Sequence, residues 1–333
     1  MQKYAIAGLG VTPQGVIPGT SAEKLAWDAA ELALRDSGLK RSQVNGYIYQ
    51  PGFGERTSGM AASRAGLGAN ATLQVDSSGA TGIFTLITAV GMIAAGTADY
   101  VMCVHATNAR SQTVTVGAGE KNQNALFGFF SPGAQAALMA QGYLHTYGKS
   151  SADLAEIAVA LRSNAVPRRD AYMFNRPITV DDHQNSPFIV RPLHLFDYCL
   201  VTDGAIAFIV TTAERARDLK TTPVGLLGFG ACHEVGQGYT RGSNTLLGPA
   251  TLDVEPARSR AFGTAGLSIE DIDVFQFYDA FTIMIALQLE AYGLCAPGEA
   301  SDWVRAGNLR WNSKRPCNTS GTLHSWGYVQ GFT

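Results

Sequence analysis

Three segments of this chain carry side chains suited to acid–base chemistry. Asp76 ends a predicted strand and opens an uncharged stretch, and Tyr278 stands in the same relation to a second apolar stretch. Another tyrosine, Tyr328, follows a glycine close to Thr333. A carboxylate can act as a general base or orient one, and a phenol can donate a hydrogen bond to a developing enolate or shuttle a proton. With an ordinary pKa of about 10, a phenol is a slow base unless a cation or a dry, polarised site assists it.

Other polar groups adjoin these segments. His324 lies four residues before Tyr328 and could polarise it, although an exposed or packed histidine is the alternative. Asp279 directly follows Tyr278, and both Asp279 and Asp76 suit the role of helix cap, Asp76 for the amide of residue 79 or its neighbours. His105 is expected to pack inside the protein.

Composition narrows the class of protein. The chain has 333 residues, 46% of them apolar, and a formal net charge of -2, so a compact core is expected and neither nucleic acid nor an anionic membrane is favoured as a partner. Its five cysteines are widely spread without metal-ligand spacing, which is typical of reduced thiols in a cytoplasmic protein and predicts no metal site. Gly8-Leu9-Gly10 lacks a third glycine in register and is read as a turn, not a dinucleotide loop.

Strands and helices alternate along the chain, which predicts an α/β protein with right-handed parallel crossovers. Strands are expected over residues 4–9, 44–49, 73–76, 99–106, 205–211, 224–229 and 274–277. Helices are expected over residues 21–36, 59–66, 133–147, 151–165, 213–219, 255–266 and 280–294. Ser21 is the predicted N-cap of the first helix, and Gly38 is its predicted C-terminal stop.

Residues 77–98 carry no charge and predict a helix that is buried on every side, within a layer between sheets. Because Tyr278 repeats the arrangement at Asp76, the chain is expected to be a duplicated fold in which both buried helices start at one central site. Residues 109–200 interrupt the alternation and predict an inserted lid that shapes a substrate pocket.

Longer motifs reveal a family resemblance that covers essentially the whole chain. They are Arg191-Pro192-Leu193-His194-Leu195-Phe196-Asp197-Tyr198-Cys199, Asp203-Gly204-Ala205-Ile206-Ala207, Phe277-Tyr278-Asp279-Ala280-Phe281, Glu290-Ala291-Tyr292-Gly293-Leu294-Cys295, Asn318-Thr319-Ser320-Gly321 and Gly327-Tyr328. On these residues the chain resembles the thiolases of the sterol-carrier and lipid-transfer branch.

That resemblance implies a thiolase fold, in which two similar βαβαβαββ halves form an αβαβα layered sandwich with an inserted loop domain. The N-terminal half would be residues 1–108 completed by 201–220, the inserted loop domain 109–200, and the C-terminal half 221–333. This last half is expected to be short, since the family has a further helix and strands after the glycine-histidine motif. The resemblance also implies a homodimer and a coenzyme A thioester as substrate, with no tightly bound cofactor.

The chain departs from this branch at its catalytic positions. Asp76 stands where the branch has its nucleophilic cysteine, and Tyr278 and Tyr328 stand where it has two histidines. Aspartate cannot hold an acyl group as a thioester, so the chemistry is expected to differ while the substrate class is kept. Tyrosines in both positions without a nucleophile resemble the thiolase-like aldolases of bacterial steroid side-chain degradation.

Membership of that group implies retro-aldol cleavage of a β-hydroxyacyl-CoA, together with a small OB-fold, zinc-ribbon partner protein. Tyr328 would be the base on the hydroxyl and Tyr278 would support or protonate the enolate, with the reverse assignment still open. A non-catalytic subunit of a complex and an acyltransferase with another nucleophile are the alternatives. Candidates for binding the phosphates of coenzyme A are Arg162, Arg168 and Arg169, for which a solvated helix face is the alternative.

Overall fold

A computed structural model describes residues 3–52, 54–55, 57–58, 66–114, 126, 131–232, 252–329 and 332. The chain divides into two compact units. The first unit contains Met1–Val114, Val201–Leu227 and Gly327–Thr333, and the second contains Thr115–Leu200 and Gly228–Trp326. Asp76 and Tyr328 therefore belong to the first unit, whereas Tyr278, Asp279 and His324 belong to the second.

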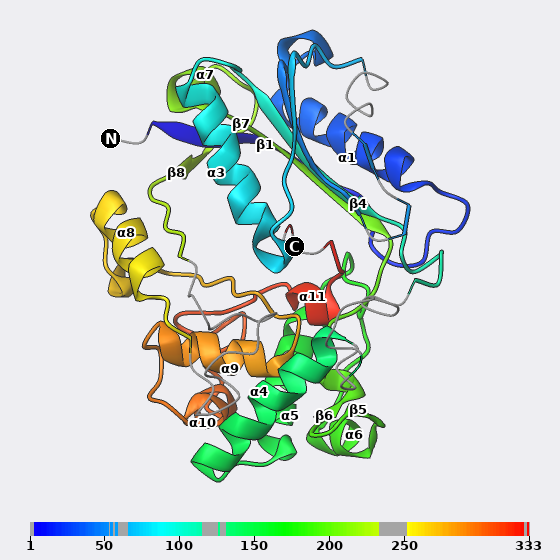
Figure 1. Cartoon of the computed structure of the whole chain (residues 1–333), viewed down its shortest axis with the longest axis vertical. Coiled ribbons are helices and arrows are strands. Elements are labelled where there is room, and N and C mark those ends of the chain that lie inside the picture. The colour runs from blue at the N-terminus through cyan, green and yellow to red at the C-terminus, as the bar shows by residue number, and fades with distance from the viewer. Residues whose placement is uncertain are drawn as a thin grey trace. The chain divides into compact units, whose positions relative to one another are not determined.

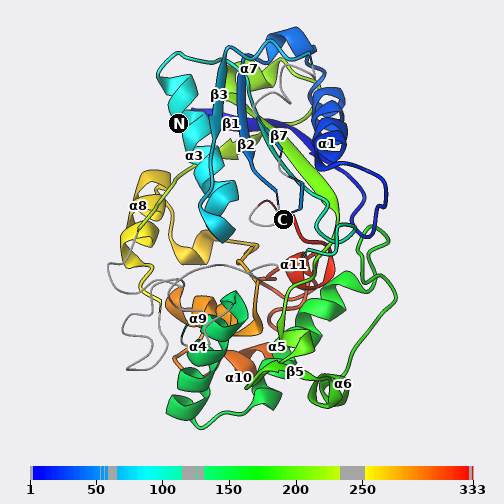
Figure 2. The same ribbon diagram turned by 45° about the vertical axis from the view of Figure 1, so that its right-hand side comes forward.

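The first unit is built on a six-stranded sheet with the order β3-β2-β4-β7-β1-β8 (Figures 1 and 2). Its strands are β1 (Tyr4–Val11), β2 (Gly46–Gln50), β3 (Ala71–Gln74), β4 (Val101–Thr107), β7 (Gly204–Thr212) and β8 (Val224–Leu226). The pairs of β2 with β3 and with β4 are parallel, and the remaining three pairs are antiparallel. The α/β class is as expected, but the sheet is mixed, because β7 runs back beside β4 and pairs with β1.

Helix α1 (Ala22–Ser37) covers one face of this sheet (Figure 2). Ser21 accepts a hydrogen bond from the Lys24 amide, and Gly38 ends the helix in the left-handed conformation, as predicted for both. A side chain at Gly8 would place its Cβ only 2.7 Å from the carbonyl oxygen of Ala33 in α1. The turn predicted at Gly8-Leu9-Gly10 is wrong, because these residues lie within β1. Their glycines instead allow close packing between the strand and α1.

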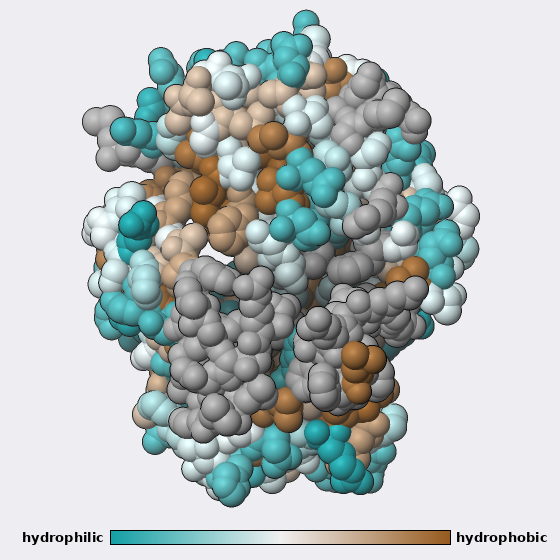
Figure 3. All heavy atoms as spheres, in the orientation of Figure 1, coloured by the Kyte–Doolittle hydropathy of each residue, from teal (hydrophilic) through white to brown (hydrophobic). Residues whose placement is uncertain are grey.

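Helix α3 (Thr81–Ala94) packs on the opposite face, where Ala89, Met92 and Ile93 join a core cluster with Ile48 of β2. The prediction that this helix is buried on every side is wrong, because Ile83 is 56% exposed. Apolar side chains gather over α3 on the face shown in Figure 3. The uncharged composition reflects partial burial along the whole helix and not a complete enclosure. Among the described residues, no helix is both long and apolar enough to cross a membrane.

The second unit is largely helical and has its core around α9 (Thr282–Ala291). Its other elements are α4 (Pro132–Tyr147), α5 (Ser151–Ala165), α6 (Val180–Asn185), the pair β5 (Phe188–Val190) and β6 (Leu193–His194), α8 (Glu255–Ala265), α10 (Ala300–Arg305) and α11 (Thr322–Ser325). The strand predicted over 274–277 is reduced to a single parallel bridge between Phe275 and Cys317. That segment pairs with a loop and not with another strand. The helix predicted over 59–66 lies almost entirely outside the described residues.

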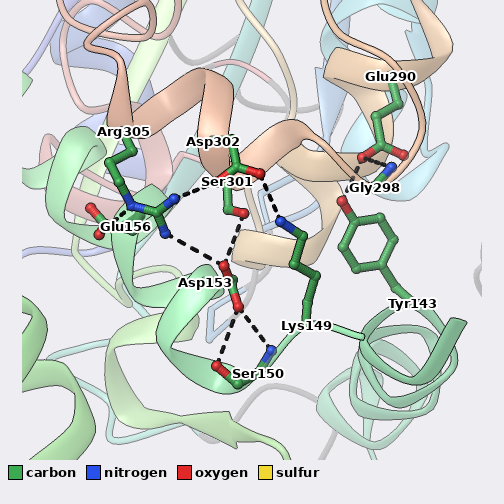
Figure 4. A network of polar contacts seen from close by, with 10 residues as sticks. All are labelled: Tyr143, Lys149, Ser150, Asp153, Glu156, Glu290, Gly298, Ser301, Asp302 and Arg305. Carbon is green, nitrogen blue, oxygen red and sulfur yellow. Dashed lines mark hydrogen bonds and ion pairs between the residues drawn. The ribbon is translucent and has the colours of Figure 1, made fainter. Parts of the chain in front are cut away.

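Polar contacts join the predicted insertion to the C-terminal part of this unit (Figure 4). Lys149 forms an ion pair with Asp302 of α10 at 2.8 Å, and Ser301 donates a hydrogen bond to Asp153 of α5 at 3.1 Å. Deeper in the unit, Tyr143 of α4 donates a hydrogen bond to Glu290 of α9. These contacts, together with the shared core, make the helices of the insertion part of the same compact body as α9 and α10.

A buried carboxyl group holds α11 in place. Asp279 is 1% exposed and accepts hydrogen bonds from the Thr322 hydroxyl, the Leu323 amide at 3.1 Å and the His324 amide at 3.2 Å. Asp279 was expected to cap the helix that follows it in sequence, but these partners are the first residues of α11. Burial raises the pKa of Asp279 to about 7, although the three hydrogen bonds oppose the shift.

This raised pKa predicts a pH dependence of stability. A carboxyl group whose pKa is higher in the folded state stabilises the fold most when it is protonated in both states, and that contribution is lost as the pH rises from about 4 to about 7. The free energy of unfolding should therefore fall over this interval, by at most about 4 kcal/mol from this group. In Asp279→Asn the fall should be smaller, as measured by urea unfolding at pH 4, 5, 6 and 7.

The matched control is Asp273→Asn, which makes the same change at an exposed residue. It should keep the pH dependence of the unaltered protein. An equal slope of unfolding free energy against pH in Asp279→Asn and the unaltered protein would contradict the role assigned to the buried carboxyl.

Candidate active site

Tyr278 lies in an irregular segment just before α9 and is half-buried against the core of the second unit. Its backbone amide donates to Gln288 Oε1 at 3.2 Å, and Gln288 Nε2 donates back to the Tyr278 carbonyl at 2.7 Å. Burial raises the pKa of the Tyr278 phenol further above its ordinary value, and Cys199 and Asp279 act in the same direction. The phenol is therefore held protonated and is suited to donate a hydrogen bond or a proton.

Tyr328 lies in the first unit, in the irregular segment after residue 326, and is 6% exposed. Its backbone amide donates to the hydroxyl of Thr202 at 2.8 Å. Gly327 packs against Gln14, since a Cβ at this position would lie 2.6 Å from Gln14 Cγ. The glycine before Tyr328 is thus required by close packing.

Asp76 is exposed near the start of the segment that joins β3 to α3. Its Oδ1 accepts a hydrogen bond from the Ser78 amide at 3.2 Å and lies 3.5 Å from Gln50 Nε2. The capping contact is therefore to an amide near residue 79. Thr81 supplies the other local contact, because its hydroxyl accepts from the Ser77 amide at 2.8 Å. The Asp76 carboxylate is exposed and therefore accessible for a catalytic role.

His324 is 4% exposed within the second unit. Burial lowers its pKa to about 3, with Asp197 opposing the shift and Arg162 and His183 adding to it. The ring is therefore neutral at pH 7, and its Nε2 has no hydrogen-bond partner among the residues that the structure describes. Its polarisation of Tyr328 stays a prediction. His105 is fully buried, as expected, and burial lowers its pKa to about 4 while Gln50 and Asp76 oppose the shift.

The three arginines differ in accessibility. Arg162 is 7% exposed and donates to the Ser325 hydroxyl and the Arg176 carbonyl, both at 3.0 Å. Arg168 is exposed and forms an ion pair with Asp170 at 2.9 Å, and Arg169 is also exposed. Arg162 therefore has an internal structural role, while the other two present charge to solvent. Phosphate binding by any of them stays a prediction.

Three thiols of the second unit are poor nucleophiles. Burial raises the pKa of Cys199 to about 12, with Asp279 adding to the shift, and burial also raises the pKa values of Cys295 and Cys317 to about 12. A thiol is reactive as its thiolate, so these groups are inert at neutral pH. In the part of the chain that the structure describes, no group of three or more His, Cys, Asp or Glu side chains is placed to hold a metal ion.

Gln288 and Thr202 were not predicted from the sequence, although both contact the backbone of a candidate tyrosine. Gln288 offers a signal, because it is the only amide side chain in the apolar run of α9. A polar side chain in such a run is usually hydrogen-bonded. Thr202 precedes the Asp203-Gly204 motif and offers no comparable signal.

Comparisons with known proteins agree with the architecture. Residues 247–333 match the family described as "Thiolase C-terminal domain-like". The "Steroid side-chain-cleaving aldolase" of Thermomonospora curvata is 35% identical over 98% of this chain and 87% of that protein. The "17-hydroxy-3-oxo-4-pregnene-20-carboxyl-CoA lyase" of Mycobacterium tuberculosis is 33% identical over 98% of this chain and 88% of that protein.

A solved structure extends the likeness to three dimensions. The "Ltp2-ChsH2(DUF35) aldolase" superposes with a TM-score of 0.88 at 33% identity, covering 99% of this chain and 87% of that chain. The expected thiolase fold is therefore confirmed, and the chain belongs to the thiolase superfamily, in the branch that contains the thiolase-like aldolases of steroid side-chain degradation.

Proposed function

We propose that this protein is an aldolase that cleaves a carbon–carbon bond in a β-hydroxyacyl-CoA thioester, of the kind that carries a steroid side chain. The observation that carries the proposal is the replacement of the thiolase nucleophile and both histidines by Asp76, Tyr278 and Tyr328. The relatives named for aldolase and lyase activity match the chain over nearly its whole length. The raised pKa of the Cys199 thiol near Tyr278 further supports chemistry without an acyl-cysteine intermediate.

In the proposed reaction a base removes the proton of the β-hydroxyl group. The oxygen then forms a carbonyl as the Cα–Cβ bond breaks, and the electron pair of that bond passes to the thioester as an enolate. Protonation at Cα gives a shorter acyl-CoA, and the other product is a ketone or aldehyde. The difficult species is the enolate, which needs hydrogen-bond donors placed at its oxygen or a proton source at its carbon.

The surroundings of Tyr278 support one assignment of roles to the two tyrosines. Tyr278 suits the enolate side, because its raised pKa keeps the phenol protonated as a donor. Tyr328 is then the base on the hydroxyl group, with Asp76 as a carboxylate that orients or replaces it. His324, which is neutral, would polarise Tyr328, and Asp279, directly after Tyr278 in sequence, holds α11.

Further features are proposed on the family's pattern. The exposed Arg168 and Arg169 are the better candidates for the phosphates of coenzyme A, since Arg162 is buried. Each chain would contain two thiolase halves, 1–108 completed by 201–220 and 221–333, with 109–200 as the inserted loop domain. Two such chains would form a homodimer in the cytoplasm. A small OB-fold, zinc-ribbon protein is the proposed partner, and the paired names of the solved aldolase support a complex.

Removal of either phenol tests the mechanism. Tyr278→Phe and Tyr328→Phe should each lower kcat by at least about 100-fold, because general acid–base catalysis contributes roughly 10²- to 10⁴-fold. The assay is release of a short acyl-CoA from 17-hydroxy-3-oxo-4-pregnene-20-carboxyl-CoA, followed by liquid chromatography. It is run with the protein alone and after co-expression with the products of neighbouring genes.

Tyr49→Phe is the control, because the Tyr49 hydroxyl donates to Gln74 at the sheet and is assigned no catalytic role. Its kcat should stay within about 2-fold of the unaltered protein. Near-normal turnover in both Tyr278→Phe and Tyr328→Phe would refute the mechanism. If the unaltered protein, with and without partners, cleaves nothing, the non-catalytic subunit is the correct reading.

A covalent adduct would indicate the third alternative, an acyltransferase. Incubation with acetyl-CoA followed by mass spectrometry of the intact protein should show no added acetyl group, because Asp76 stands at the nucleophile position and the Cys199 thiol near Tyr278 is protonated. A thiolase with its cysteine intact is the positive control. An adduct that maps to one residue of this chain would point to acyl transfer.

A further inference from the structure

We propose that Gln288 and Thr202 are positioning residues, each of which fixes the backbone of one catalytic tyrosine so that its hydroxyl group meets the substrate. The inference rests on the proposed function. It gives Gln288 and Thr202 a role in positioning the tyrosines, without contact to the substrate or the reacting atoms. Tyr278 and Tyr328 both lie in segments outside helices and strands. Their backbone groups must therefore find partners other than those of regular secondary structure.

Gln288 meets this need at Tyr278. Its Oε1 accepts from the Tyr278 amide at 3.2 Å, and its Nε2 donates to the carbonyls of Tyr278 at 2.7 Å and Met284 at 2.8 Å. Both hydrogens of the Gln288 amide group donate to these carbonyls. If the amide group were flipped, its NH2 would face the Tyr278 N–H donor and its oxygen would face two carbonyl acceptors. Only one orientation of the amide is thus compatible with its three partners.

The helix that carries Gln288 is a rigid support. Ile283, Ile285, Leu287 and Leu289 of α9 are all fully buried, so the helix is anchored on several sides and cannot turn about its axis without breaking core contacts. The position of Gln288 is therefore set by the core, and Gln288 in turn sets the position of the Tyr278 backbone.

In the first unit, Thr202 holds the backbone of Tyr328 in the same way. Thr202 is fully buried, and its hydroxyl oxygen accepts from the Tyr328 amide at 2.8 Å. The hydroxyl hydrogen has two acceptors within reach, Gln14 Oε1 at 3.4 Å and the Tyr328 carbonyl at 3.5 Å. Gln14 also packs against Gly327, so the residue before Tyr328 is held from a second direction.

The residue next to Thr202 explains why this hydroxyl is well placed. Asp203 is fully buried and accepts from the Ile17 amide at 2.7 Å and the Ser111 amide at 3.0 Å. Gly204 then packs so closely on Gln14 that a side chain there would overlap its amide group. Thr202 therefore projects from a segment tied to two other parts of the first unit.

Backbone position matters because a tyrosine hydroxyl lies at the far end of a long, stiff side chain. A small rotation at the backbone is magnified at the hydroxyl, and a misplacement of about 1 Å in a catalytic group can cost roughly 100-fold in rate. Loss of either contact should therefore lower the rate of the chemical step and leave substrate affinity largely unchanged.

The first test compares steady-state kinetics of single variants on the same β-hydroxyacyl-CoA. Gln288→Met keeps the length of the side chain and removes all three hydrogen bonds, and Thr202→Val removes only the hydroxyl group. Each should lower kcat by roughly 10- to 100-fold with KM changed less than about 3-fold. Thr202→Ser, which keeps the hydroxyl, should recover kcat to within about 3-fold of the unaltered protein.

Gln276→Glu is the matched control, because Gln276 is exposed two residues before Tyr278 and bonds to Thr319. Its kinetics should be unchanged. Gln288→Glu is the second variant if Gln288→Met does not fold. It keeps the acceptor for Tyr278 but turns an oxygen toward two carbonyls, and it should show the same loss of kcat. Circular dichroism and the Tm identify which variants are folded.

A double-mutant comparison separates positioning from a merely structural role. If Gln288 acts only through the Tyr278 hydroxyl, adding Gln288→Met to Tyr278→Phe should lower the residual kcat by less than about 2-fold. The same holds for Thr202→Val added to Tyr328→Phe. Unchanged kcat in the folded single variants, or losses that multiply in the double variants, would overturn the inference.

These variants distinguish failure of the proposed aldolase function from failure of the positioning role. If Tyr278→Phe and Tyr328→Phe are fully active, the proposed function fails regardless of Gln288 and Thr202. If those variants are inactive while Gln288→Met and Thr202→Val are fully active, the proposed function stands and only the positioning role fails.

Discussion

Burial is the largest influence on the protonation states of three groups in the second unit. It keeps the Tyr278 phenol protonated, raises the pKa of the Cys199 thiol to about 12, and lowers the pKa of the His324 ring to about 3. At neutral pH this environment presents neutral hydrogen-bond donors and neither a thiolate nor an imidazolium ion. Such an environment suits stabilisation of a developing enolate better than nucleophilic attack on a thioester.

The same low polarity makes every buried hydrogen bond costly to lose. Asp279 illustrates the point, since its carboxyl group is fully enclosed yet accepts three hydrogen bonds from the start of α11. The contact links the residue after Tyr278 to a short helix that runs toward Tyr328 in sequence. Side chains far apart in the chain thus support the irregular segments that carry the candidate catalytic groups.

Close packing explains several residues that a motif search would read differently. The glycines of β1 resemble part of a nucleotide-binding loop, but they admit α1 to the strand at a distance that any side chain would prevent. The uncharged stretch in α3 resembles an enclosed helix, but Ile83 is more than half exposed. The predictions of a turn at the first segment and of complete burial for the second were both wrong, because how closely a segment packs depends on neighbours that only the fold supplies.

The sequence by itself determined the long helices α1, α4 and α5, the central strands β4 and β7, the caps at Ser21 and Gly38, and the residues at positions 76, 278 and 328. These features are local, because propensity, capping and motif spacing depend on neighbours along the chain. The tertiary structure alone decided that Asp279 caps α11 and not α9, that 274–277 forms a bridge and not a strand, and that Gln288 and Thr202 hold the tyrosine backbones. Those outcomes depend on burial and on hydrogen bonds between residues that only folding brings together.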